Sequence, residues 1–463
     1  MTTSEQLSRE RDEMITKFEE SAQQLQANAD YYNAESRPHA IGVSVPIPMR
    51  KLLAQVGYPR LYVNALSDRL EVEGFRTDTE SEGDSMLWDW WTANGLDVQS
   101  VLAHTDALVN GRSYITVSTP TEDDFRIDPN VPIIRVEPAT SLYAVKDPRT
   151  HEIVRAIRVS YAEKGGEVVG ATMYTPESTY TWIVDKNGWS NPHVINHDLG
   201  IVPVVPLENT TLLSDRYGSS EITPELRSVT DAASRIMMNM QATAELMAVP
   251  QRLLFGVKPE ELGVDPSTGQ VLFDSYLARI MAFEDEGAKA TQFQAAELIN
   301  FSHALTELAK QAAAYTGLPP QYLSTDSDNP ASAEAIKASE SRLVKNAERK
   351  TKVFGGAWEQ AMRVAYKAMN GGNVPTEYFR METVWRDPST PTYAAKADAA
   401  TKLFGAGQGV IPRERARIDM GYTIVERAEM KVWDADDATL LANTILAGTS
   451  EGTSNGDDSK EAE

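Results

Sequence analysis

The sequence contains no cysteine. Disulfide bridges, thiolate metal sites and cysteine nucleophiles are therefore excluded, which fits a reducing compartment such as the cytoplasm. No run of about 18 apolar residues is present, and the first residues lack the basic and apolar regions of a signal peptide. We therefore expect a protein that is neither exported nor membrane-spanning.

The motifs of several enzyme classes are also missing. There is no phosphate-binding Gly-Lys-Ser/Thr loop, no nucleophile elbow and no compact set of metal ligands. His193 and His197 have the spacing of a helical metal pair, but Pro192 and the strand-like surroundings argue against a helix. We expect no catalytic residue, no metal and no cofactor, although an acid–base pair could be hidden among the 67 acidic residues.

Basic charge is scarce, and the formal net charge is −23. This balance argues against a tight, unspecific grip on nucleic acid, which depends on Lys and Arg neutralising phosphates. It does not exclude DNA passing by, because a surface that repels phosphates can guide a polyanion without holding it. The chain has 463 residues, 41% hydrophobic and 24% charged, which predicts a soluble globular protein of two or more domains.

Residues 291–369 are predicted to form two helices joined by a short loop. A first helix carries apolar residues at steps of three and four: Leu298, Phe301, Leu305, Leu308, Ala312 and Tyr315. Gly317 and the pair Pro319-Pro320 end this helix, because Gly suits a left-handed position and proline lacks an amide donor. A second helix starts at Asn329-Pro330 and runs to Met369, roughly 58 Å at about 1.5 Å per residue. Such a helix is a strut.

The rest of the chain predicts a mixed α+β fold. Further helices are expected at 4–28, from Pro59 to Leu70, and at 85–94, 98–109, 223–247, 259–262, 391–403, 412–420 and 424–446. Strands are expected at 72–75, 113–117, 133–136, 153–159, 170–174, 179–184, 270–273 and 378–385, with a turn at 185–188. Trp88, Trp90 and Trp91 are interpreted as core residues rather than as a partner patch. The acidic residues 449–463 are predicted to be disordered.

The chain resembles the portal, or head-to-tail connector, proteins of long-tailed, siphovirus-type bacteriophages. The resemblance covers nearly the whole chain and is specific through the order and spacing of its motifs, each of which is weak alone. These motifs are Leu70–Arg76, Ala107–Tyr114, Gly200–Leu207, Tyr217–Ile222, Thr316–Leu323, Asn329–Ile336 and Trp385–Pro388.

The resemblance implies a portal fold with a β-rich wing, a two-helix stem, a small mixed clip, a long strut helix and an α-helical crown. The implied divisions are an N-terminal arm (1–30), the wing (31–222, β-rich at 131–207), stem helices (223–247 and 291–316), the clip (248–290), a tunnel loop (317–328), the strut helix with a strand returning to the wing (329–390), the crown (391–448) and the acidic tail (449–463). The tunnel loop would line a DNA channel through Leu318, Pro319, Pro320, Gln321, Tyr322, Leu323, Ser324, Asp326 and Asp328.

By the same resemblance the protein is a structural ring, usually dodecameric, at one vertex of the capsid. It would be assembled in the host cytoplasm and remain in the virion. Double-stranded DNA would be packaged, retained and ejected through its channel without sequence specificity. The implied partners are the terminase large subunit, the head–tail adaptor proteins, and the major capsid and scaffold proteins, and no membrane.

Two surfaces are predicted to join copies of the chain. The apolar seams of the two stem helices would be covered by neighbouring copies: Leu226, Val229, Ile236, Met240, Leu298, Phe301, Leu305 and Leu308. The strut helix carries eight basic against four acidic residues between Ala331 and Asn370. Its basic side chains would meet acidic surface on the next copy: Lys337, Arg342, Lys345 and Arg349. The alternative is a solvated helix face.

Two other classes compete with the portal interpretation. One is an enzyme with an unrecognised acid–base pair. The other is a non-portal head morphogenesis protein, such as a scaffold or a minor interior protein, which could share the acidic helical character. A scaffold would need neither the β-rich lobe nor a Gly-Pro-Pro loop between two helices, and both features favour the portal.

Overall fold

The computed structural model describes residues 3–36, 55–77, 84–122, 124, 127–163, 166–248, 252–255, 280–283, 298–323, 333–389, 391, 393–405, 409–422 and 424–451. The chain divides into two compact units. The first unit consists of residues 1–67, 105–112 and 209–346, and the second of residues 68–104, 113–208 and 347–463. Each unit is described separately.

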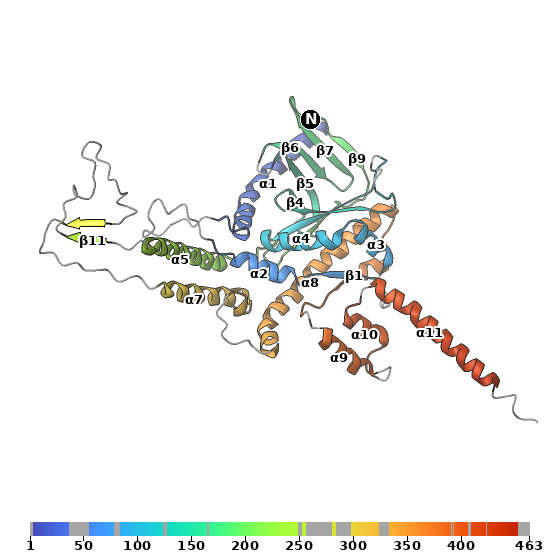
Figure 1. Ribbon diagram of the computed structural model, residues 1–463. Coiled ribbons are helices and arrows are strands. Elements are labelled where there is room, and N and C mark those ends of the chain that lie inside the picture. Colours follow the sequence, from blue (N-terminus) through green and yellow to red (C-terminus); the bar gives the residue numbers. More distant parts are fainter. Residues whose placement is uncertain are drawn as a thin grey trace, which may run out of the picture. The chain divides into compact units, whose positions relative to one another are not determined.

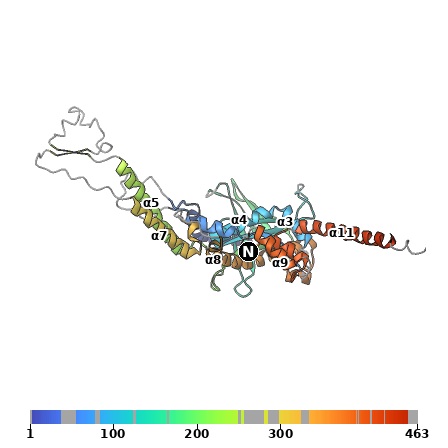
Figure 2. The same cartoon turned by 60° about the horizontal axis from the view of Figure 1, so that its bottom comes forward.

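The first unit is built on helices. They are α1 (Thr3–Tyr32), α2 (Tyr58–Ser67), α5 (Pro224–Ala248), α7 (Ile299–Thr316), the short 3-10 helix η3 (Pro320–Tyr322), the end of α4 (Leu96–Asn110) and the start of α8 (Ala333–Asn370). Helices α5 and α7 lie side by side and antiparallel (Figures 1 and 2), as predicted. Residues 291–297, the expected start of α7, lie outside the described residues.

Helix α1 is bound to the first unit by its apolar face and by its last turn. Met14, Phe18 and Leu25 are buried. Tyr31 Oη donates to Asp231 at 2.9 Å, and Tyr32 Oη donates to Asn64 at 2.8 Å. The polar helix expected from the sequence is therefore confirmed and is four residues longer at its C-terminal end.

A short parallel pair of strands, β11 (Arg252–Phe255) and β12 (Ile280–Phe283), lies between α5 and α7 in sequence. Neither strand was predicted. The helix expected at 259–262 and the strand expected at 270–273 lie outside the described residues.

The second unit contains the β-rich part of the chain. The large sheet has the order β4-β5-β6-β7-β8, with β9 also paired to β7 (Figure 1). Its strands are β4 (Leu142–Lys146), β5 (Ile153–Tyr161), β6 (Val168–Tyr174), β7 (Ser178–Asp185), β8 (Gly188–Trp189) and β9 (His193–Asn196). Alternation with period two puts Ile157, Met173 and Trp182 in the core. His193 begins a strand, so the helical metal spacing does not apply.

Two smaller sheets complete the strands of this unit. One has the order β10-β2-β3 and the other pairs β1 with β13. Their bounds are β1 (Val72–Arg76), β2 (Arg112–Ser118), β3 (Ile133–Pro138), β10 (Val204–Glu208) and β13 (Glu382–Trp385). The strand predicted at 378–385 is wrong in its first half, where the 3-10 helix η4 (Thr376–Arg380) forms. The physical reason is Tyr378, which is buried and donates to Asp84.

The helices of the second unit include α3 (Ser85–Ala93), most of α4, the second part of α8, α9 (Tyr393–Phe404), α10 (Arg413–Met420) and α11 (Ile424–Glu451). Trp90 and Trp91 are buried, as predicted, whereas Trp88 is half-buried and stacks on Trp91. Disorder predicted from residue 449 is wrong for Thr449–Glu451, which end α11. Residues 452–463 lie outside the described part. Within the described ranges, no helix combines the length and apolarity of a membrane span.

Candidate functional site

The loop after α7 is fixed by its own backbone and by the start of α8. Gly317 adopts φ 75° and donates its N–H to Ala313 O at 2.8 Å. A Cβ at this position would lie 2.8 Å from Cδ of Arg342, so a larger residue would be strained by the conformation and would displace the Arg342 side chain. Thr316 Oγ1 donates to Ala312 O and accepts the N–H of Leu318, which closes the helix end.

Three side-chain hydrogen bonds connect this loop and the end of α7 to α8. Tyr322 Oη donates to Glu340 Oε1 at 2.6 Å, and Gln321 Nε2 donates to Ser339 Oγ at 3.0 Å. Arg342 donates to Ala314 O at 2.9 Å. We call these three contacts the loop clamp. They hold residues 317–323 against the first turns of α8.

The structure corrects one expectation about this loop. Leu318 is only 4% exposed, so its side chain packs within its own unit and does not line a channel. Gln321 and Tyr322 are exposed. Ser324, Asp326 and Asp328, also expected in the tunnel loop, lie outside the described residues.

The packing of α5 and α7 differs in part from the predicted seam. On α5, Leu226 and Val229 are buried, whereas Ile236 and Met240 are half-buried. On α7 the buried residues are small: Ala309, Ala312, Ala313 and Thr316. Apart from Ala312, the predicted seam on α7 is half-buried or exposed in the single chain: Leu298, Phe301, Leu305, Leu308 and Tyr315, with Tyr315 53% exposed. Small residues let two helices approach closely, and this leaves the larger apolar side chains uncovered by the chain itself.

The predicted basic residues on α8 are all exposed: Lys337, Arg342, Lys345 and Arg349. Arg342, Lys345 and Arg349 share one face of the helix, since they are three and four residues apart. Arg342 also belongs to the loop clamp, a role within the chain that the sequence did not indicate.

A crossing of two loops in the first unit was missed by the sequence reasoning. Gly218 has φ +74°, and a Cβ there would lie 2.0 Å from Gly111 O. Asn209 donates its backbone N–H to Gly111 O at 2.8 Å and its side chain to Ser219 O at 2.7 Å. The two segments therefore touch backbone to backbone. Glycine in both Asn110-Gly111 and Tyr217-Gly218 was the only available signal.

Beside this crossing lies a buried carboxylate. Glu221 is 9% exposed and accepts from Tyr62 Oη at 2.7 Å and from Asn209 Nδ2 at 3.0 Å. Asn346 on α8 donates to Tyr62 Oη at 3.0 Å. Burial and the Glu221 carboxylate raise the pKa of Tyr62, so the hydroxyl stays protonated as a donor. The network joins α2 and α8 to the segment at 209–221.

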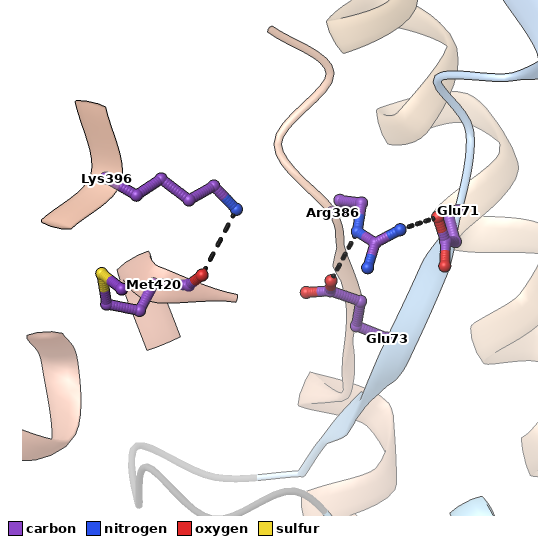
Figure 3. Close-up of polar contacts among 5 residues, drawn as sticks. All are labelled: Glu71, Glu73, Arg386, Lys396 and Met420. Atoms are coloured by element: carbon purple, nitrogen blue, oxygen red, sulfur yellow. Dashed lines mark hydrogen bonds and ion pairs between the residues drawn. The ribbon is translucent and has the colours of Figure 1, made fainter. Parts of the chain in front are cut away.

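In the second unit, Arg386 binds Glu73 on β1 and Glu71, which directly precedes this strand (Figure 3). Its Nε donates to Glu73 at 3.2 Å, and a terminal nitrogen donates to Glu71. The backbone N–H of Arg386 also donates to Glu71 O at 2.9 Å. Burial raises the pKa of Glu73, and Arg386 opposes that shift. Lys396 Nζ contacts Met420 O at 3.5 Å between α9 and the end of α10.

These contacts bring the sequence motifs together in pairs. Residues 70–76 meet 385–386 along β1 and β13, residues 107–114 meet 217–222 at the glycine crossing, and residues 316–323 meet the start of α8. Five of the seven motifs therefore form one side of a contact between distant segments. This is a physical reason why motifs that are weak alone are informative in combination.

A comparison with known protein families agrees with the resemblance to portal proteins. The model of the family "Phage portal protein, SPP1 Gp6-like" matches residues 11–438. The chain belongs to this family. The portal protein of Mycobacterium phage D29 is 63% identical over 431 residues, which cover 93% of this chain and 89% of the relative. The portal protein of Mycobacterium phage L5 is 62% identical over the same shares. Among solved structures, a chain of the virion of a native gene transfer agent particle has 16% identity and a TM-score of 0.42, covering 79% of this chain and 88% of that one.

The protein is thus a component of the phage virion that acts at the capsid vertex, where DNA is packaged and passes. It is structural and not an enzyme. The predictions of family, function and location are confirmed, and both competing classes are wrong. The fold is mixed α+β, as predicted.

Proposed function

We propose that the first unit provides the channel and the main assembly surface of the ring. Helices α5 and α7 are the stem, residues 248–290 the clip, and the loop after Gly317 the tunnel loop. Residues 131–207 belong to the wing, 391–448 are the crown, and α8 is the strut that reaches from the loop to the wing. The single observation that carries this proposal is the loop clamp, because it holds an exposed loop in a fixed position.

The loop guides DNA rather than binding it. Residues 318–323 include no Lys or Arg, so this part of the loop cannot form the charge-assisted phosphate contacts on which DNA-binding proteins rely. The exposed Gln321 and Tyr322 face away from the core of the unit, and Pro319 and Pro320 restrict the backbone. DNA can slide past such a surface in either direction.

The ring, usually twelve copies in this family, is closed by the uncovered apolar side chains of α7. Leu305 and Leu308 are half-buried in a single chain, and a neighbouring copy would cover them. Full burial of one leucine contributes about 1.5–3 kcal/mol. The exposed basic face formed by Arg342, Lys345 and Arg349 then meets acidic surface on the next copy and fixes its register.

The partners follow from the proposed parts. The clip binds the terminase large subunit during packaging and the head–tail adaptors afterwards. The wing and crown meet the major capsid and scaffold proteins. Double-stranded DNA passes through the channel without sequence specificity, and no membrane is involved.

Assembly is tested by placing charge on the apolar surface of α7. Replacing Leu305 and Leu308 with Asp should dissociate the ring or prevent it from forming, because each buried aspartate would lack a partner. Gln311→Asp is the matched control, since Gln311 is exposed on the same helix. The mass of the particle in light scattering provides the measurement. A ring of normal mass for the double variant would exclude this part of α7 from the interface.

DNA movement is tested by placing positive charge in the loop. Gln321→Lys combined with Ser324→Lys should leave the ring assembled but slow packaging by a cognate motor, most strongly at low salt, where screening is weak. Gln360→Lys, at an exposed position of α8, is the control. Normal packaging by assembled double-variant rings at low salt would show that the loop does not face the DNA.

A further inference from the structure

A groove of about 720 Å³ lies in the second unit along the C-terminal half of α8. Apolar side chains of β5, of β10 and of the segment before β10 line much of it, among them Ile153, Val154, Val202 and Val204. Phe379 also lines the groove and is 66% exposed. Large exposed apolar side chains beside a concave surface are typical of a place where another chain docks. We call this surface the α8 groove.

Two cations of α8 line the same groove without an ion pair. Arg363 and Lys367 are four residues apart on the helix, so they lie on one face. Both are half-buried, and neither forms a salt bridge with a residue of the described ranges. Arg363 uses one of its five N–H groups, in a bond of 3.3 Å to Tyr378 O. Burial lowers the pKa of Arg363, and Glu359 opposes that shift. An anionic group in the groove would therefore stabilise this side of it.

Charge of the opposite sign comes from the turn between β4 and β5. Asp147 and Glu152 line the groove from this turn. The Asp147 carboxylate accepts from the backbone N–H groups of Arg149 and Thr150. The Glu152 side chain is exposed and has no partner in the described part of the chain. A segment that fits the groove should therefore combine large apolar side chains with an acid and a base.

The first unit presents such a segment at Thr211–Arg216, which we call the dileucine turn. Leu212 is 66% exposed and Leu213 is fully exposed, and Asp215 and Arg216 follow them. The Asp215 carboxylate accepts from Thr211 Oγ1 at 2.9 Å and from the Leu212 N–H at 3.3 Å. These hydrogen bonds, that from Thr211 above all, hold the pKa of Asp215 below its usual range, so the carboxylate stays ionised. The turn is thus fixed before it meets a partner, which lowers the entropy lost on binding.

We infer that the dileucine turn of one copy docks in the α8 groove of a second copy. Leu212 and Leu213 would cover apolar side chains of the groove. Asp215 would then meet the cations of α8, and Arg216 the acids of the β4–β5 turn. Each chain carries one turn and one groove, so every copy can give one contact and receive another. Head-to-tail contacts of this kind close into a ring. The inference rests on the ring of the proposed function and adds a contact that does not involve α7.

The first test asks whether the ring covers the dileucine turn. The chain has no cysteine, so Leu213→Cys introduces a single thiol. In the assembled ring this thiol should react with a maleimide about tenfold or more slowly than in the denatured chain, because docking excludes the reagent. Lys186→Cys, at an exposed position of the β7–β8 turn, is the control and should react at nearly the same rate in both states. Equal rates for the two thiols in assembled rings would overturn the inference.

Cross-linking then identifies the surface that covers the turn. Leu213→Cys combined with Val154→Cys should be joined by a short bismaleimide into a ladder of linked chains on denaturing electrophoresis, because each contact connects two copies. Leu213→Cys combined with Val169→Cys is the matched control and should give no ladder. Val169 is 38% exposed and Val154 40%, but Val169 lies on the paired strand β6 and does not line the groove. Equal ladders for both pairs, or links within single chains only, would overturn the inference.

A charge reversal tests the pairing with α8. Lys367→Glu in the chain that carries Leu213→Cys and Val154→Cys should lower the yield of linked chains about threefold or more, since Asp215 would then meet a like charge. Lys352→Glu, at an exposed position of the same helix, should leave the yield unchanged. Equal yields for the two reversals would contradict the pairing. Light scattering separates the two proposals: rings of normal mass without a ladder overturn the docking alone, whereas chains that stay monomeric overturn the ring itself and the docking with it.

Discussion

In the first part of α8, exposed polar side chains hold the loop after α7, whereas in its second part apolar side chains fill the core of the second unit. Residues 336–349 include Lys337, Arg342 and other exposed positions, with only Leu343 and Ala347 buried. From residue 354 onward the buried residues are large or closely packed: Phe354, Trp358, Ala361, Met362 and Ala365. Buried apolar area stabilises a fold far more than exposed hydrogen bonds do. The second part should therefore determine stability, and the first part should determine the position of the loop.

The largest effect is expected at Trp358. Its ring packs edge-on against Trp91, and its Nε1 donates to His104 Nε2 at 2.9 Å. Trp358→Ala should lower the free energy of unfolding by about 3–5 kcal/mol through lost packing and a cavity. Trp433→Ala is the control, since Trp433 is 59% exposed and should change stability by less than about 0.5 kcal/mol. Chemical denaturation measures the free energy of unfolding of both variants. Equal losses of stability would contradict the conclusion that the second part of α8 determines stability.

The second largest effect is a dependence of stability on pH that arises from His104. The ring is fully buried, with Nδ1 at 3.1 Å from Leu70 O, and burial lowers its pKa to about 3. Between pH 6.5 and 3 the unfolded chain binds a proton on His104 that the folded chain does not. Stability should therefore fall as pH decreases through this window, by up to about 1.4 kcal/mol per pH unit from this group, and the contribution is fully present above pH 6.5.

His104→Gln isolates this contribution, because glutamine keeps a donor and an acceptor but does not titrate. The slope of unfolding free energy against pH should become shallower by about one proton for the variant. If wild type and variant have the same slope between pH 6 and 4, His104 is not neutral and buried as the structure has it.

Replacing either of two glycines by alanine should change stability by a smaller amount, with opposite signs at the two positions. Gly317→Ala should cost about 1–2 kcal/mol, since an L-residue is strained in the left-handed region and its Cβ would meet Arg342. Gly356→Ala, at an exposed helical position with no atom within 4 Å of the added Cβ, should be neutral or stabilising by up to about 1 kcal/mol. Thermal unfolding of the two variants provides the measurement. A stabilising Gly317→Ala would contradict the conformation of the helix end.

The smallest effect on stability is expected in the loop clamp itself. Tyr322→Phe removes the bond to Glu340 at an exposed site and should cost less than about 1 kcal/mol. Its effect should appear locally, as faster hydrogen exchange of residues 317–323. Tyr315→Phe, at an exposed position of α7, is the control. Unchanged exchange in Tyr322→Phe would mean that the clamp does not hold the loop.

Local signals in the sequence were sufficient for much of the fold. Pro59 predicted α2, steps of three and four ending at Gly317 predicted α7, and the capping pair Asn329-Pro330 predicted α8, because these features act within one helix. Alternating residues predicted β5, β6 and β7 for the same reason. The short strands β4, β9 and β10 were missed, since four or five residues give little periodicity, and their pairing depends on neighbours in the sheet.

The contacts of the candidate site were less predictable, because they depend on distant residues. The sequence reasoning found the motifs. It did not predict that Gly111 touches Gly218 or that Arg342 binds the end of α7. The apolar period of α7 indicated a seam without saying which side packs against α5. In the structure the buried side of α7 carries Ala309, Ala312 and Ala313 rather than the larger apolar residues.

The most direct test of the portal account is a cryo-electron microscopy map of the purified ring at side-chain resolution. The account predicts a closed ring with an axial channel, with residues 317–328 at the channel wall and Leu305 and Leu308 buried against the neighbouring copy. A map in which this loop faces the outside of the ring, or in which both leucines remain exposed to solvent, would contradict it.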